Sequence, residues 1–484
     1  MAFLPELILL GGALALFFLC LGDDRVEERA RRARLAAIAV AVAFIGSSLG
    51  SLGQDAFLFH GAYRVDAFSQ WLKLAFAIGD LLILLLSGDL PDVRDDVKPE
   101  YYLLLTLSVT GLTLLVSCLD LVTLVIAFEL SSFPLYFLVP MRRERAGQRV
   151  QMESAIKYVM FGILSTGVML FGMSYLFGLT GTTSLPSLMT KLEPVSQSPV
   201  AIVGLGMMFA GFFYKLAVFP LHFWTPDVYQ GASNETAGLI ASLPKVGAVA
   251  VLARFVTTAP PGSQTLAVLL TCLAAASMFY GNLVALLQKD LKRLLAFSSI
   301  AHAGYALVGF VALDNAGATA ALYYIVSYMF MVMACFVVVC RVSRDGANVA
   351  LDDLAGLHRR SPLLAVTLLV GVFGLAGLPP FAGFMGKLTL LKAALAKGHL
   401  ALVVIAVINT AIAIYYYLAI VREAGFREAE DRPAVVLDGS TRALCVLLIV
   451  GVLVLGLAPN PVLNAISASL LNLGLPVPAT ALAW

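Results

Sequence analysis

The sequence predicts an all-α membrane protein whose helices cross the bilayer many times. Of its 484 residues, 60% are hydrophobic and 13% are charged, whereas a soluble domain is about one quarter charged. The apolar residues are gathered into runs of about twenty, the length that an α-helix needs to cross a bilayer. The connections between these runs alternate between rich and poor in arginine, except that the one after the seventh run, which falls on the basic side, holds no Lys or Arg. These patterns exclude a soluble enzyme and predict about fourteen transmembrane helices.

The spans follow from the positions of the apolar runs. They are expected near residues 3–21, 35–53, 67–87, 101–118, 120–140, 151–178, 199–219, 236–257, 265–286, 292–312, 316–340, 362–397, 400–421 and 439–458. The first run lacks a basic leader and is read as a retained helix. The twelfth is long and is interrupted by Gly377-Leu378-Pro379-Pro380, which predicts two half-helices. The chain after residue 458 has too many Pro and Asn residues to assign.

The stretch from Gly53 to Val65 alternates aromatic and small residues around a glycine. This pattern predicts a short external β-hairpin.

Loop charge orients the chain in the membrane. The basic connections carry Arg25, Arg29, Arg31, Arg32, Arg34, Arg94, Lys98, Arg142, Arg143, Arg145, Arg149, Lys289, Lys292, Arg293, Arg341, Arg344, Arg359, Arg360, Arg422, Arg427, Arg432 and Arg442. The intervening connections carry few basic residues, mainly Arg64, Lys191 and Lys397. Because basic loops stay on the cytoplasmic side, we expect a bacterial inner-membrane protein with both termini on the non-cytoplasmic side.

Two lysines inside apolar runs carry the strongest functional signal. A lysine at mid-bilayer costs roughly 2.5 to 3.5 kcal/mol, so Lys215 and Lys245 are expected to have a function. Pro220 has no N–H for the carbonyl of Leu216, and Pro244 similarly loosens the helix that holds Lys245. Broken helices beside buried ionisable groups are typical of transporters.

A small set of ionisable residues in the spans suits a proton relay. It comprises Glu129, Lys157, Lys215, Lys245, His302 and Lys387. A buried lysine and a buried glutamate favour their neutral forms when alone and their charged forms when paired, so moving them apart drives a proton off. A histidine titrates near neutral pH and is a natural intermediate. Two alternatives stay open: Lys157 can extend to the membrane interface, and His302 can be a packing residue.

A faint internal repeat supports a transport path. Residues 155–158 (Ala-Ile-Lys-Tyr) match residues 321–324 (Ala-Leu-Tyr-Tyr), and a similar offset brings Pro220 near Pro380. Repeats with broken helices at matching positions indicate a path at the interface between them.

The chain shows no redox chemistry of its own. Its six cysteines lie in apolar segments without metal-ligand spacing, and it has no dinucleotide-binding glycine motif and no paired haem histidines. We therefore expect no cofactor and no metal in this chain, and no nucleic-acid partner.

Several motifs together resemble the N subunit of proton-pumping NADH:quinone oxidoreductase, respiratory complex I. They are Glu129-Leu130, the segment 153–158, Lys215 followed by residues 220–231 (PLHFWTPDVYQG), Pro244-Lys245, residues 292–305 (KRLLAFSSIAHAGY) and residues 377–387 (GLPPFAGFMGK). The resemblance extends from about residue 100 to 400.

The resemblance implies a fold and a division of the chain. It implies an antiporter-like bundle of fourteen helices with two inverted five-helix repeats and helices broken near 215–225 and 377–387. The expected parts are an N-terminal region (1–100), a first repeat (101–260), a second repeat (261–421) and a C-terminal helix and tail (422–484). Glu129 is then the partner of Lys215, Lys245 the central relay, and Lys387 the group near the outer half-channel.

The resemblance also implies partners. They are the M-type and small hydrophobic membrane-arm subunits, with FMN, iron–sulfur clusters, NADH and quinone bound in other subunits. Ser233-Asn234-Glu235 departs from the family's usual Pro-Thr-Pro. Lys387 argues against the M-type subunit, which resembles this chain but has a glutamate there.

Two other functions were weighed. A multi-subunit sodium/proton antiporter subunit looks similar, but Trp224-Thr225-Pro226-Asp227 and the segment 298–302 favour the respiratory type. A structural scaffold is the third, and in that case Lys215→Met would leave pumping intact.

Overall fold

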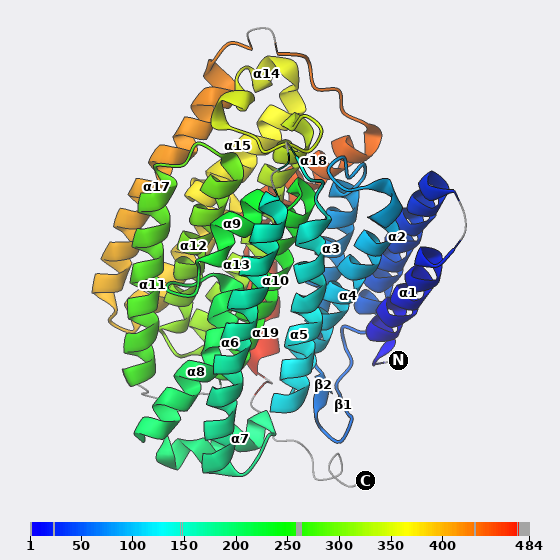
Figure 1. Ribbon diagram of the computed structural model, residues 1–484. Helices are drawn as coiled ribbons and strands as arrows, with labels where there is room; N and C mark the ends of the chain where they lie inside the picture. The colour runs from blue at the N-terminus through cyan, green and yellow to red at the C-terminus, as the bar shows by residue number, and fades with distance from the viewer. Residues whose placement is uncertain are drawn as a thin grey trace.

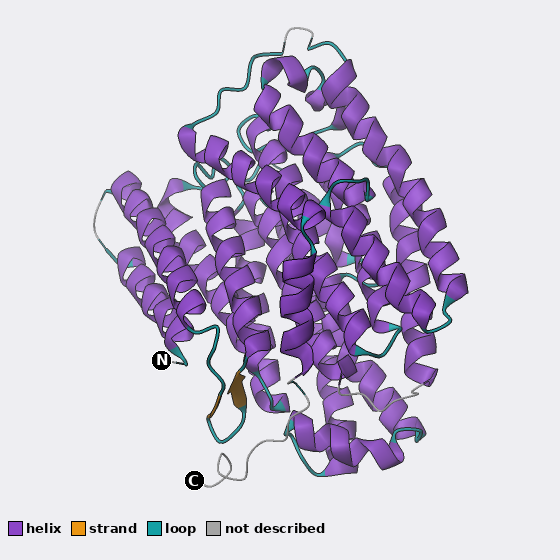
Figure 2. Cartoon of the chain, turned by 180° about the vertical axis from the view of Figure 1, so that it is seen from behind, coloured by secondary structure: helices purple, strands orange, loops and turns teal. Residues whose placement is uncertain are grey.

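The protein is a bundle of helices with one small two-stranded sheet (Figures 1 and 2). The computed structural model describes residues 2–22, 25–145, 147, 149–257, 264–429, 432–471 and 473. The helices are α1 (Leu4–Cys20), α2 (Val26–Gly50), α3 (Ala67–Leu86), α4 (Lys98–Ser117), α5 (Leu121–Leu138), α6 (Val150–Thr180), α7 (Leu185–Leu192), α8 (Pro199–Leu216), α9 (Trp224–Gly231), α10 (Asn234–Thr257), α11 (Gln264–Ala285), α12 (Leu291–Phe310), α13 (Asn315–Val342), α14 (Leu357–Arg360), α15 (Pro362–Ala376), α16 (Ala382–Ala396), α17 (Leu400–Phe426), α18 (Gly439–Leu457) and α19 (Asn460–Leu471). The strands are β1 (Ala56–Leu58) and β2 (Tyr63–Val65).

The helices agree with the predicted number of spans. Among the described residues, 11 helices are long and apolar enough to cross a membrane, and α1 and α15 are shorter apolar helices. Counting α1, the buried helix α12 and the broken pair α15–α16 with those 11 gives the fourteen spans expected. Helix α19 lies in the segment that the sequence left unassigned, and the residues after 473 lie outside the described chain.

The predicted hairpin is confirmed. Strands β1 and β2 pair antiparallel, with Ala56 opposite Val65. Phe59, His60 and Gly61 all take positive φ in the turn. The alternation of side chains therefore identified the strands correctly.

The arginine-rich connections meet at one end of the bundle. Arg29 donates to the Asp96 carbonyl at 3.2 Å. A buried aspartate in the α3–α4 connection, Asp92, accepts from Arg142 at 2.5 Å and from Arg145 at 2.8 Å. These contacts put the connections α1–α2, α3–α4 and α5–α6 side by side, as the alternation of loop charge predicts.

Two groups of helices share one local design. An isolated β-bridge joins Asp120, before α5, to Ser184, before α7. A second joins Asp290, before α12, to Ala350, after α13. In both groups the aspartate also caps the helix that follows it, because its carboxylate accepts backbone N–H groups of the first turn. The first bridge leads to α7 at the bottom of Figure 1 and the second leads toward α14 at the top, so the two groups are inverted.

Each group contains a broken helix with the same turn. Helix α8 ends before Ala217 (φ 67°), and α15 ends before Gly377 (φ 83°). After each left-handed residue a backbone N–H reaches back five residues, from Val218 to Phe213 at 2.8 Å and from Leu378 to Phe373 at 3.0 Å. This is the Schellman ending of a helix. Both predicted breaks are confirmed.

Helix α10 lies at the centre of the bundle. Its apolar window is 100% buried, and it contacts α3, α4, α8, α12 and α13. It continues through Pro244, so this proline does not break the helix as Pro220 breaks the path of α8. The helix places Lys245 in the middle of the protein, away from lipid.

An ion pair joins α1 to α3 in the interior. Lys73 Nζ lies 2.7 Å from Glu6 Oε1, both side chains have 0% exposure, and Tyr63 donates to the same carboxylate at 2.6 Å. Both residues fall in predicted spans, at 3–21 and 67–87, but neither was predicted to be a buried ionisable group.

Removing one partner of this pair is expected to destabilise the protein. Lys73→Met should cost about 3 to 5 kcal/mol of unfolding free energy, because Glu6 would stay buried without its countercharge. Equilibrium unfolding in mixed detergent micelles measures this cost. The double variant Glu6→Gln, Lys73→Met should recover part of the loss, and a cost below about 1 kcal/mol for Lys73→Met would show that the pair does not hold α1.

Candidate functional site

Lys215 lies at the end of α8 and is fully enclosed. Its ammonium group donates to Ser131 Oγ and, at 3.4 Å, to the carbonyl of Phe128. It also lies 4.3 Å from the centre of the Phe128 ring, a cation–π contact. The hydroxyl and ring of α5 thus hold the cation without neutralising it.

Lys245 caps the broken helix. Its Nζ donates at 2.9 Å to the carbonyl of Leu216, the last residue of α8, and Lys245 is 1% exposed. Carbonyls at a helix C-terminus have no partner within the helix, and a cation there is favourable. The acceptor that Pro220 frees is therefore used by a lysine from another helix.

Lys387 repeats this arrangement in the second group. Its Nζ donates to the carbonyls of Leu375 and Ala376 at 3.1 and 3.0 Å, at the end of α15. A Cβ on Gly377 would lie 2.9 Å from Lys387 Cδ. Glycine is therefore required there by both its positive φ and the close approach of the lysine stem.

His302 is close enough to both Lys245 and Lys387 for each lysine to act on it electrostatically. Its Nδ1 is 2.5 Å from the hydroxyl of Tyr324, and its Nε2 is 2.9 Å from that of Tyr417. Hydroxyls both donate and accept hydrogen bonds, so each ring nitrogen has a partner that can exchange a proton.

Glu129 is near Lys215 without contacting it. Among the described residues its carboxylate accepts from Thr166 Oγ1 at 2.5 Å, and it forms no ion pair with Lys215. Lys215 nevertheless senses the charge of Glu129 electrostatically. The two groups are close enough to influence each other and lie outside direct pairing distance.

Lys157 occupies a different environment from the other lysines. Its side chain is 38% exposed and pairs with Glu153 and with Asp227, both at 2.7 Å. Asp227 also pairs with Arg293 at 2.9 Å. Lys157 thus lies at the rim of the first broken helix, in an ion-pair network that joins α6, α9 and α12.

The expectation that Lys292 is a loop charge was wrong. Lys292 has 0% exposure, and its Nζ donates at 2.8 Å to the carbonyl of Ala232, directly after α9. Arg142 donates to the neighbouring carbonyl of Gln230 at 2.7 Å. The prediction failed because Lys292 stands with Lys289 and Arg293 in a group of charges that is typical of a loop. The position of Lys292 at the first residue of the apolar run 292–312 was the signal that it could be buried.

Other buried ionisable groups were also missed. The structure buries Glu6, Lys73, Asp80, Glu235 and Arg254. Glu235 lies in the divergent turn at the start of α10, and its Oε2 has no hydrogen-bond partner among the described residues. Four of these residues lie inside predicted spans, which was a signal that they are buried. Glu235 gave no such signal, because it directly precedes the predicted span 236–257.

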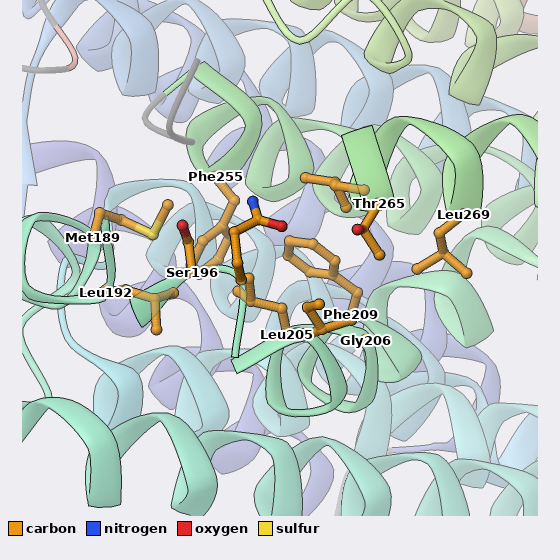
Figure 3. A pocket seen from close by; sticks show the side chains of 12 residues that line it. Met189, Leu192, Ser196, Leu205, Gly206, Phe209, Phe255, Thr265 and Leu269 are labelled. Atoms are coloured by element: carbon orange, nitrogen blue, oxygen red, sulfur yellow. The ribbon is translucent and has the colours of Figure 1, made fainter. Parts of the chain in front are cut away.

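The pocket shown in Figure 3 is separate from these groups. It lies where α7, α8 and α11 approach, and its lining includes Met189, Leu205, Phe209 and Leu269. No charged side chain is among its described lining residues. It therefore takes no part in the polar path.

The polar groups lie near one another inside the bundle. The Leu216 carbonyl that Lys245 caps is next to Lys215 in the chain, both Lys245 and Lys387 act on His302, and Glu129 acts on Lys215. Lys215, Lys245 and Lys387 each have a carbonyl or hydroxyl partner, and none of the three forms an ion pair among the described residues. A row of unneutralised ammonium groups at mid-depth is costly, and it suits the transfer of protons.

The comparisons with known proteins agree with this architecture. The family NADH:quinone oxidoreductase/Mrp antiporter, TM matches residues 118–413. NADH-quinone oxidoreductase subunit N 2 of Opitutus terrae is 65% identical over 470 residues, covering 97% of each chain.

Solved structures agree as well. A chain of respiratory complex I from Thermus thermophilus with bound aureothin is 33% identical and has a TM-score of 0.82, over 96% of this chain and 100% of that one. A chain of the Mrp complex from Dietzia sp. DQ12-45-1b has a TM-score of 0.84 at 21% identity, over 98% of this chain and 97% of that one, and it shows the shared fold alone. This chain therefore belongs to the NADH-quinone oxidoreductase subunit N family, within the wider antiporter-like family of membrane proteins.

Proposed function

We propose that this chain is a membrane-arm subunit of NADH:quinone oxidoreductase that translocates protons while partner subunits transfer electrons. One observation supports this most: Lys245 and Lys387 are both buried, and each donates to one or two carbonyls at the point where a helix is broken. Relatives named as subunit N, at up to 65% identity over nearly the whole chain, support the assignment.

The proposed relay uses Glu129, Lys215, Lys245, His302 and Lys387. Moving the negative charge of Glu129 toward or away from Lys215 changes how strongly this lysine holds its proton. The proton then passes laterally through Lys245 and His302 to Lys387, which releases it at the outer side. Lys157, with its partly exposed ion pairs, is assigned to the rim, where it couples α6 to α9, and Asp227 in turn pairs with Arg293 of α12.

The partners follow from the same proposal. They are M-type and small hydrophobic subunits, with FMN, iron–sulfur clusters, NADH and quinone in the other parts of the complex. The proposed location is a bacterial inner membrane, with both termini on the non-cytoplasmic side. The proposed parts of the chain are residues 1–100, 101–260 for the first repeat, 261–421 for the second and 422–484.

Purification of the tagged chain in mild detergent tests this proposal. Co-purification of flavin, iron–sulfur signals and NADH:quinone reductase activity is expected. Recovery with only small hydrophobic partners and no redox centre would overturn the proposal in favour of a multi-subunit sodium/proton antiporter, a function that the fold of the Mrp neighbour also accommodates.

A further inference from the structure

A second buried carboxyl group lies outside the relay described above. Asp80 is in the C-terminal half of α3 and is 2% exposed. Its Oδ1 has no hydrogen-bond partner among the described residues. It also forms no ion pair there, whereas Lys73, two turns away on the same helix, is paired with Glu6. Burying a carboxylate without a partner is expensive, so a structural role does not account for Asp80.

The packing of α3 on α10 gives the depth of Asp80. A Cβ on Gly79 would lie 2.3 Å from Leu243 Cδ2, and one on Gly247 would lie 3.8 Å from Phe76 Cζ. The two helices thus run antiparallel, and Asp80 falls level with the turn of α10 that holds Lys245. Since a helix rises 1.5 Å per residue, the two groups differ in depth by about one turn or less.

The packing of α3 on α4 places a buried serine at the depth of Asp80. Ser87 Oγ lies 3.4 Å from the hydroxyl of Tyr101, and a Cβ on Gly247 would contact both Phe76 and Leu112. These contacts set Ser87 opposite Tyr101 and Phe76 opposite Leu112 on two antiparallel helices. Asp80 is four residues after Phe76 and Ser108 is four residues before Leu112, so the two lie at the same depth.

Ser108 lies near the first lysine of the relay, since both bond to Ser131. Ser108 donates at 2.8 Å to the carbonyl of Ser131, and the hydroxyl of Ser131 accepts from Lys215. Both serines have 0% exposure. Ser131 thus lies between Ser108 and Lys215 and meets them with two different atoms, its backbone carbonyl and its hydroxyl.

The other charges on helices packed against α3 lie farther away in depth. On α10, Glu235 and Arg254 are eight and eleven residues from Leu243, which is about 12 and 16 Å along the axis. The guanidinium of Arg34 of α2 lies beside Gly88, beyond the end of α3. The other charges lie near the ends of their helices: Lys98 and Glu100 of α4, Arg341 of α13 and Arg442 of α18. Lys245 is therefore the charged group nearest in depth to Asp80.

We propose that Asp80 is a proton-exchanging group of the translocation path, acting with Lys245, the charged group of α10 nearest to it in depth. The protonated acid gives its proton to a neutral lysine amine by way of water, which leaves a carboxylate and an ammonium, and the reverse step restores both neutral groups. The inference rests on the proposed function and adds a carboxyl group on α3 to the one that Glu129 supplies from α5.

The test is the initial rate of NADH-driven proton translocation in vesicles that hold the assembled complex. Asp80→Asn keeps the shape and removes the proton, so we expect a rate at least about fivefold lower, and Asp80→Glu should restore most of it. Asp89→Asn is the matched control, because Asp89 follows the same helix and is 69% exposed, and its rate should be unchanged.

Chemical labelling gives a second readout. A hydrophobic carbodiimide reacts with protonated carboxyl groups in apolar surroundings, so an adduct on the peptide that contains Asp80 is expected in the wild-type complex and is lost in Asp80→Asn. Absence of the wild-type adduct would overturn the proposal, since a proton-exchanging acid must hold a proton for part of the cycle.

The remaining outcomes are distinguishable. If Asp80→Asn pumps as the wild type does and Lys245→Met does not, Asp80 is outside the path and the proposed function stands. If both variants pump normally, the proposed relay itself fails. If Asp80→Asn and Asp80→Glu both lower the yield of assembled complex, Asp80 is a packing residue and the inference is overturned.

Discussion

Replacing Lys387 with methionine is expected to lower the rate of NADH-driven proton translocation by about tenfold or more, which corresponds to about 1.4 kcal/mol in the barrier. The ammonium group is the only titratable partner of the carbonyls that end α15 among the described residues. Methionine fills a similar volume, so the helix break should persist while the proton carrier is lost. Acidification of vesicles containing the assembled complex measures the rate.

The same helix supplies a matched control. Lys392 is exposed and lies five residues further along α16. Lys392→Met removes the same charge from a position that faces outward, so pumping should stay within experimental error of the wild type. Equal losses for both variants would mean that the net charge of α16 matters and that Lys387 has no special role.

The second large effect concerns Glu129 and Lys215. Glu129→Gln and Lys215→Met should each lower pumping by about tenfold, and the double variant should be scarcely worse than either one. Groups that act as a unit are strongly non-additive, and Lys215 senses Glu129 electrostatically although the two are not paired. The vesicle assay on the three variants, each corrected for the amount of assembled complex, measures the coupling.

The outcome separates the functions considered from the sequence. Additive losses would show that Glu129 and Lys215 act independently, and would contradict the switch. Full pumping by Lys215→Met would support a structural scaffold.

Much of the fold could be predicted because each span carries its own signal. Apolar runs gave the helices, loop charge gave their alternation, and Pro220 and the Gly377 segment gave the two breaks. These features are local, since a proline or a glycine acts on the few residues around it. The start of α10 and the existence of α19 were less accessible, because Asn and Pro residues blur the ends of helices.

The site could be predicted only in part, because its contacts join distant segments. The sequence indicated that the carbonyl of Leu216 lacks a partner, but only the packing of α10 on α8 shows that Lys245 takes it. Likewise, hydropathy could not tell that Lys292 turns inward to the carbonyl of Ala232, because its neighbour Arg293 is a genuine rim charge.

The most direct test of the relay is the proton-translocation rate of the Lys245→Arg variant in the assembled complex. Arginine keeps the positive charge and can still cap the Leu216 carbonyl, but it does not release its proton at physiological pH. If Lys245 passes protons, Lys245→Arg should pump about as poorly as Lys245→Met while the complex still assembles. Pumping at the wild-type rate would show that only the charge is needed, and would contradict the proton relay.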